Sequence, residues 1–161
     1  MKEQLKKLLT MQRLLDEEIF AKNKIKKYPL DNMVVALYVE LGELMNEFPT
    51  EFKHWKASAV DNREKGLEEY VDVLHIMLSL FNYCGLNSTN VVSYNIYNKR
   101  PFDDRYKLSD ELKKITRGYD NYEGLSCLFR LGNYLGFTWD EVYLAYKRKN
   151  RVNHDRQERG Y

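Results

Sequence analysis

The sequence predicts an all-α protein, and three observations support that prediction. Apolar residues recur at helical spacing along most of the 161 residues. Proline occurs only at positions 29, 49 and 101, so long stretches can continue as helices. No segment has the alternation of apolar and polar residues that marks a strand. Without repeats or a second domain boundary, we expect one helical bundle over 1–161, a length that can bury a substantial core.

The first two helices follow from their apolar spacing. The first is expected over 2–20, followed by a basic linker that ends at Pro29. The second is expected over 32–48, capped by Asp31 or Asn32 and ending before Pro49. The residues of this second helix that should face the core are Val34, Leu37, Leu41, Leu44 and Phe48.

The third helix is expected over 64–83, after a loop and a cap at Asp61 or Asn62. It is apolar nearly all round, which is typical of a central, buried helix. Gly85 should end it.

Four shorter segments complete the predicted bundle. Helices are expected over 88–99, 109–116 and 121–135, the last closed by Gly136. The final helix opens with the capping-box pattern Thr138-Trp-Asp-Glu141 and should run to about Asn153.

Composition excludes several classes of protein. A net charge of only +2 does not favour a general polyanion-binding surface, although basic residues gather between 147 and 159. Cys84 and Cys127 are far apart and form no CxxC, so we expect buried, reduced thiols in a cytoplasmic protein. No stretch resembles a signal peptide or approaches the ~20 apolar residues of a membrane span.

Two acidic couplets are the strongest functional signal. Glu40 and Glu43 lie three residues apart at the edge of an apolar stripe, and Glu69 and Asp72 do so inside the buried helix. Surface salt bridges explain most single couplets of this kind. Two of them one loop apart favour a divalent cation instead, because ionised groups beside a core are costly without a counter-charge. Carboxylates with waters and phosphates suit Mg²⁺.

Other residues have both a functional and an ordinary structural interpretation. Lys149, Asn153 and Arg156 form one stripe if the last helix continues, which suits a polyphosphate or merely a basic tail. Trp55, beside Lys53, can stack on a base or close the edge of the core.

Two residues inside apolar patterns have the same ambiguity. Gln12 can read a base edge, although a surface or capping role is commoner for a lone glutamine. His75, one turn beyond Asp72, can orient a ligand or form a hydrogen bond in the core.

Four motifs together resemble the dimeric dUTPases, a branch of the MazG-like all-α nucleoside triphosphate pyrophosphatases. They extend from near the amino terminus to the last residue, and the terminal motif is the most discriminating. The motifs are Met11-Gln12-Arg-Leu-Leu-Asp16-Glu-Glu-Ile19, Val39-Glu40-Leu-Gly-Glu43-Leu-Met-Asn46-Glu47, Glu68-Glu69-Tyr-Val-Asp72-Val-Leu-His75 and Tyr-x-x-Lys149-Asn150-x-x-Asn153-x-x-Arg156-Gln157-x-x-Gly160-Tyr161.

The resemblance implies a homodimer that hydrolyses dUTP to dUMP and pyrophosphate by attack of water on the α-phosphorus. This reaction keeps uracil out of DNA and supplies dUMP, and dUDP is a further candidate substrate. Two or three Mg²⁺ ions would be needed, with Mn²⁺ as a candidate substitute. Residues 147–161 would close over the bound nucleotide.

The resemblance also assigns roles to individual residues. Glu40 would be catalytic, orienting or activating the water, and His75 would lie near the deoxyribose. The implied metal ligands are Glu40, Glu43, Glu69 and Asp72; the phosphate contacts are Lys53, Lys149, Asn153 and Arg156; the uracil contacts are Trp55, Gln12 and Asp16; and Tyr161 is a further substrate-binding residue.

Three alternatives remain open at this stage. A sister pyrophosphatase could prefer dCTP or accept several deoxynucleotides, since uracil and cytosine differ only at N3 and C4. A dimeric regulatory protein could use the same site to sense a nucleotide, and a protein regulator could bind the enzyme. Nonspecific nucleic-acid binding by the tail is disfavoured by the small net charge.

Overall fold

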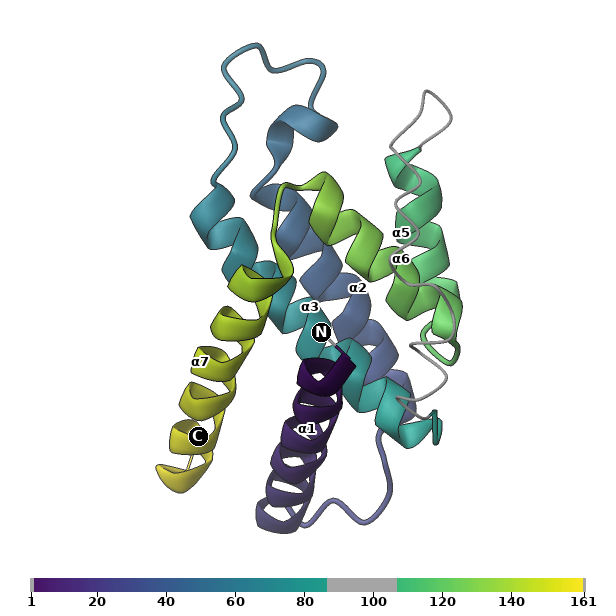
Figure 1. Cartoon of the computed structure of the whole chain (residues 1–161), viewed down its shortest axis with the longest axis vertical. Helices are drawn as coiled ribbons and strands as arrows, with labels where there is room; N and C mark the ends of the chain where they lie inside the picture. Colours follow the sequence, from purple (N-terminus) through teal and green to yellow (C-terminus); the bar gives the residue numbers. More distant parts are fainter. Residues whose placement is uncertain (1, 87–106, 161) are drawn as a thin grey trace.

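The computed structural model describes residues 2–86 and 107–160, and within them the chain is all-helical, as predicted. These residues form six α-helices and one short 3-10 helix, joined by loops, and contain no strand (Figure 1). The helix expected over 88–99 lies outside the described residues. No described helix is long and apolar enough to cross a membrane.

Helix α3 (Arg63–Tyr83) lies at the centre of the bundle, as its apolar sequence predicts. It packs against α1 (Lys2–Lys22), α2 (Leu30–Asn46), α6 (Tyr122–Tyr134) and α7 (Trp139–Glu158). Its buried side chains run through most of its length. The Asn62 side chain accepts a hydrogen bond from the Lys65 backbone N–H, which confirms the predicted cap. Gly85, with φ of +67°, follows the end of the helix.

Helix α2 starts two residues earlier than predicted, so its expected cap is wrong. Pro29 occupies the N-cap position, and no side chain caps the helix. Asp31 instead lies in the first turn, where its charge still interacts favourably with the helix dipole. At the other end the helix stops at Asn46, and Phe48 packs its ring against Gly66 of α3 so closely that a β-carbon there would clash. This contact brings α2 close to α3.

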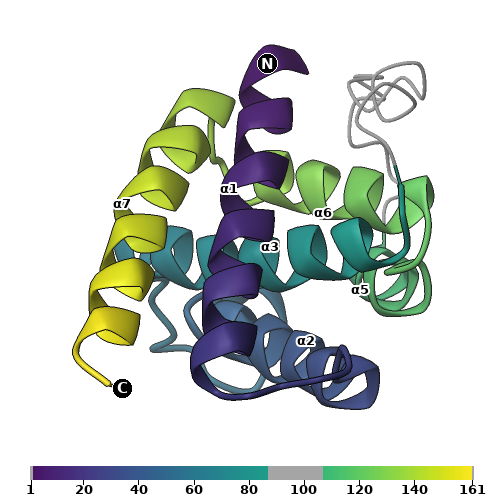
Figure 2. The ribbon, with the colours of Figure 1, turned by 90° about the horizontal axis from the view of Figure 1, so that it is seen from below.

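Helices α1 and α7 lie side by side and run in the same direction (Figure 2). Three hydrogen-bonded pairs mark their length: Gln4 with Trp139, Gln12 with Tyr146, and Glu18 with His154. The capping box of α7 is formed as predicted, with Thr138 and Glu141 each bonding the other's backbone. The helix continues past Asn153 to Glu158, so the terminal basic motif is helical.

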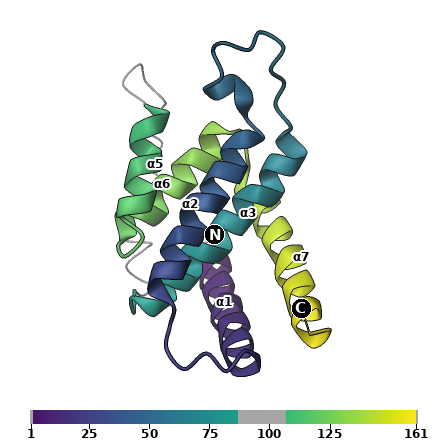
Figure 3. The same ribbon diagram turned by 180° about the vertical axis from the view of Figure 1, so that it is seen from behind.

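The remaining elements are peripheral to this group. Helices α5 (Leu108–Arg117) and α6 pack together beside α2 and α3, joined through an ion pair between Glu111 and Arg130. The segment after α2, which includes η1 (Pro49–Glu51), projects at one end of the long axis, and α7 ends at the other (Figures 1 and 3). Both cysteines are free; Cys127 is buried as expected, whereas Cys84 is only partly so.

Candidate functional site

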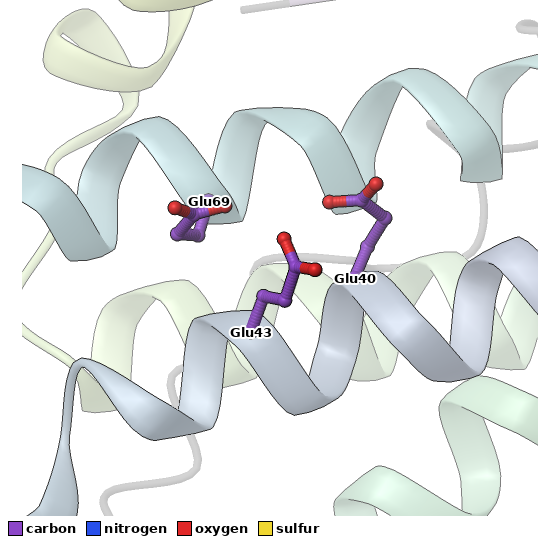
Figure 4. Close-up of side chains that lie close together, drawn as sticks. All are labelled: Glu40, Glu43 and Glu69. Carbon is purple, nitrogen blue, oxygen red and sulfur yellow. The ribbon is translucent and has the colours of Figure 1, made fainter.

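Three carboxylates converge between α2 and α3. Glu40 and Glu43 point from α2 toward Glu69 on α3 (Figure 4). Each offers an oxygen, and these oxygens lie within 4.8 Å of one another. Three of the four carboxylates of the two acidic couplets therefore lie together across the helix pair. We call Glu40, Glu43 and Glu69 the acidic trio.

The electrostatics of the trio favour a cation. Burial raises the pKa of Glu40 to about 7, and the neighbouring charges of Asp72, Glu43 and Glu69 add to that shift. The pKa of Glu69 is also raised, first by burial and then by Asp72 and Glu43. Each negative charge is thus destabilised by the others. Glu40 and Glu69 are partly buried and Glu43 is exposed. A set of carboxylate oxygens fits a hard divalent ion such as Mg²⁺, and these side chains are the ones that could hold it.

Asp72, the fourth predicted ligand, is not a member of the trio. Its Oδ2 accepts a hydrogen bond from the Lys149 ammonium of α7, with an Nζ to Oδ2 distance of 2.6 Å. Burial raises the pKa of Asp72, and the bond to Lys149 opposes that rise. Without a bound metal, a cation from the terminal motif therefore neutralises the fourth acid.

Lys65 is a second cation beside the trio, and the sequence analysis missed it. Its Nζ lies 2.7 Å from a carboxylate oxygen of Glu47 and 3.9 Å from one of Glu69. The signal that could have found it is its position one turn before Glu69 on α3. The pairing joins α3 to Glu47, the residue that follows the end of α2, and it has no local signature.

The residues predicted to read the base form a buried polar cluster between α1, α3 and α7. Gln12 is only 4% exposed, so the surface interpretation of this residue is wrong. Its Nε2 donates to Asp16 at 2.8 Å and its Oε1 accepts from Tyr146 at 2.6 Å. Burial raises the pKa of Asp16 to about 6, although bonds from Ser79 and Gln12 oppose the shift.

His75 lies in the same cluster. The ring is 5% exposed, and its Nδ1 is 2.9 Å from the carbonyl oxygen of Val71. Burial lowers the pKa of His75 to about 4. At neutral pH the ring is therefore uncharged.

Trp55 and Lys53 lie apart from these groups. Trp55 is 68% exposed, so it does not close the edge of the core. Its neighbours are Phe52 and His54, both edge-on to the indole, and Lys53 lies over the Phe52 ring. Figures 1 and 3 place this segment, 49–62, at the opposite end of the molecule from the carboxyl end of α7.

The terminal stripe exists as predicted because α7 stays helical through Glu158. Lys149 contacts Asp72, and the charge of Arg156 also lowers the Asp72 pKa, which places it on the same side of α7. Asn153 is partly buried. Tyr161 lies outside the described residues.

The raised carboxyl pKa values predict that the metal-free protein becomes more stable between pH 8 and pH 6. A group whose pKa is higher in the folded state binds its proton more tightly there, so Glu40, and below it Asp16, add stability as pH falls. His75 has a lowered pKa, so it reduces this gain in stability once the pH falls below about 6.5. We expect the Tm in EDTA to rise by about 2–4 °C, measured by calorimetry.

Two comparisons make this pH prediction specific. Saturating Mg²⁺ should flatten the dependence, because a bound cation stabilises the ionised carboxylates. Glu40→Gln should also reduce it, since that carboxyl no longer titrates. A Tm in EDTA that falls steadily from pH 8 to pH 6 would contradict the prediction.

Residues 4–161 match the model of the dUTPase_2 family, which is described as dUTPase. The match covers nearly the whole chain, including the acidic trio, the buried polar cluster and the stripe on α7. No curated protein matches the chain.

Proposed function

We propose, since the chain belongs to the dUTPase_2 family, that it hydrolyses dUTP to dUMP and pyrophosphate. The observation that carries the proposal is the acidic trio, held between two packed helices within reach of a cationic helix. This arrangement suits a triphosphate, because metal ions held by the carboxylates and the cationic side chains can each neutralise part of its negative charge. The family match supports uracil as the base.

The metal ligands in this proposal are the trio and Asp72. They would hold two or three Mg²⁺ ions, with Mn²⁺ as a candidate substitute. The ions supply Lewis acidity at the phosphate oxygens and lower the pKa of a bound water. The fit rests on the donor set and on the raised pKa values of Glu40 and Glu69.

Glu40 is the proposed general base. Its pKa of about 7 in the metal-free protein shows how strongly its surroundings favour a proton on this carboxyl. A carboxylate at this position can orient water and accept its proton as the water oxygen bonds to the α-phosphorus. Pyrophosphate then departs with the bonding electrons of the broken P–O bond.

Lys149, Asn153 and Arg156 are the proposed phosphate contacts. With nucleotide bound, Lys149 would donate to a phosphate oxygen in place of Asp72. The exchange replaces one charge-assisted hydrogen bond with another, so its net cost is small. Residues 147–161 would in this way close over the nucleotide.

Gln12, Asp16 and His75 are proposed to contact the nucleoside from inside the bundle. Trp55 is proposed to contact the uracil and Lys53 a phosphate, both from the projecting segment. Tyr161 is proposed as a further substrate contact. The segment 49–62 and the carboxyl end of α7 lie at opposite ends of one molecule, so one chain does not bring these two parts together.

We propose a homodimer, in which a second copy completes the site. The outward face of α2 exposes Val35, Tyr38 and Val39, which are each at least half exposed. These residues are next to Glu40 along the helix, so a partner bound there would lie beside the acidic trio. Light scattering should give twice the chain mass of 19.3 kDa, and Val35→Lys should shift it toward one chain.

The test of the proposed function is pyrophosphate release from dUTP, dCTP, dTTP and UTP, each with Mg²⁺ and with excess EDTA. We expect fast turnover of dUTP alone, abolished by EDTA. Turnover of dCTP or of several nucleotides would move the protein to a sister pyrophosphatase activity. Nucleotide binding without any turnover would instead favour the sensor function.

A further inference from the structure

Tyr146 of α7 contacts both of the buried residues that are proposed to face the nucleoside. The side chain is fully buried. Its hydroxyl lies 2.6 Å from Gln12 Oε1 on α1. Its ring stacks parallel to His75 of α3, with centroids 3.9 Å apart and planes 8° from parallel. One side chain thus joins three helices at this point.

The bond to Asp16 fixes which way the Gln12 amide faces, and the bond from the Tyr146 hydroxyl is a second constraint on it. Gln12 Nε2 donates to Asp16, and an ionised carboxylate can only accept, so the nitrogen must lie on the Asp16 side. The oxygen then faces Tyr146, whose hydroxyl must be the donor. One N–H and one oxygen lone pair of Gln12 remain for a ligand. The nitrogen and the oxygen of the amide cannot exchange places without breaking both bonds.

The stacked ring fixes the plane of His75, whose free nitrogen is an acceptor. Nδ1 faces a carbonyl oxygen, so it carries the hydrogen. Nε2 is then a bare lone pair, and it is buried without a hydrogen-bond partner among the described residues. A buried acceptor of this kind is costly unless a ligand supplies an N–H or O–H.

We propose that Tyr146 is the positioning residue for base selectivity, acting through the Gln12 amide and the His75 ring. Uracil presents a donor at N3 and an acceptor at O4, whereas cytosine presents the reverse at these positions. An amide held in one orientation matches one base and leaves unpaired polar groups with the other. Without the Tyr146 hydroxyl only the Asp16 bond holds the amide, so it turns over more readily and can match either base. The inference rests on the proposed function.

The test is Tyr146→Phe, which removes the hydroxyl and keeps the stacked ring. We expect the ratio of kcat/KM for dUTP to that for dCTP to fall about tenfold. At saturation, kcat for dUTP should change less than threefold, because the acidic trio is untouched. The matched control is Tyr143→Phe, the same change one turn earlier on α7, which should leave the ratio unaltered.

A double-mutant cycle separates positioning from general loss of packing. In a Gln12→Met background the amide is absent, so Tyr146→Phe should have no further effect on the ratio. The pKa of His75, followed by NMR, should stay low in Tyr146→Phe because the stacked ring remains, and should rise in Tyr146→Ala, where water gains access.

Equilibrium binding of dUMP and dCMP without metal gives a readout independent of turnover. A preference for dUMP that Tyr146→Phe loses supports the inference. A Tyr146→Phe protein with the full wild-type preference, or a wild type with none, overturns it. If the wild type discriminates between the monophosphates but does not hydrolyse dUTP, the proposed function fails and the positioning role stands.

Discussion

Replacing Glu40 with glutamine is expected to lower dUTP turnover by about 10³-fold while raising the stability of the metal-free protein. The amide cannot take a proton from water, and general-base catalysis of this kind contributes on that order. The same change removes a carboxylate whose pKa is raised to about 7, first by burial and then by the charges of Asp72, Glu43 and Glu69. Pyrophosphate release and the Tm in EDTA at pH 8 measure the two effects on one preparation.

The two readouts together distinguish a functional role from a structural one. Glu64→Gln is the matched control, because Glu64 is an exposed acid in the first turn of α3 and should tolerate the change in both assays. Glu69→Gln and Asp72→Asn should also remove activity, since each deletes a charge proposed to face the metal. Full activity in both would refute the metal assignment, whereas full activity in Glu40→Gln alone would remove Glu40 as the base.

Local patterns in the sequence predicted the helices of the described residues and a set of four carboxylates, of which three lie together. The capping box at Thr138 and the cap at Asn62 are set by residues three positions apart, so they can be identified without tertiary structure. The trio was predictable because the two couplets flank one loop on helices that must pack. The Asp31 cap failed because Pro29 took the N-cap position, and propensity does not decide between adjacent candidates.

Apart from the local pair of Lys65 with Glu69, the contacts that sequence reasoning missed join distant segments. Lys149 pairs with Asp72, and Tyr146 pairs with Gln12, across separations that leave no periodic signal. Gln12 was ambiguous for the same reason: its burial depends on α7 covering it. The placement of Trp55 depends on the whole course of the segment after α2, which the residues of that segment do not specify.

Deleting residues 147–161 is expected to reduce turnover more than 100-fold without unfolding the bundle or preventing metal binding. The truncated chain keeps Val142, Ala145 and Tyr146, which are the buried apolar anchors of α7. It loses Lys149, Asn153 and Arg156, the proposed phosphate contacts, and charge-assisted bonds to a transferring phosphoryl group are large contributors to catalysis. The acidic trio stays intact, so Mg²⁺ binding by calorimetry should persist.

Two point variants assign the loss to the cationic stripe rather than to a shortened helix. Lys149→Met should lower turnover about tenfold or more and leave Asp72 without its ammonium partner, so the pKa of Asp72 should rise further. His154→Gln breaks only the bond to Glu18 at the end of α1 and should leave kcat nearly unchanged. If the truncated chain kept full activity, closure of the terminal segment would have no part in the reaction, and the positive charge opposing the triphosphate would have to come from Lys65, Lys53 or a second subunit.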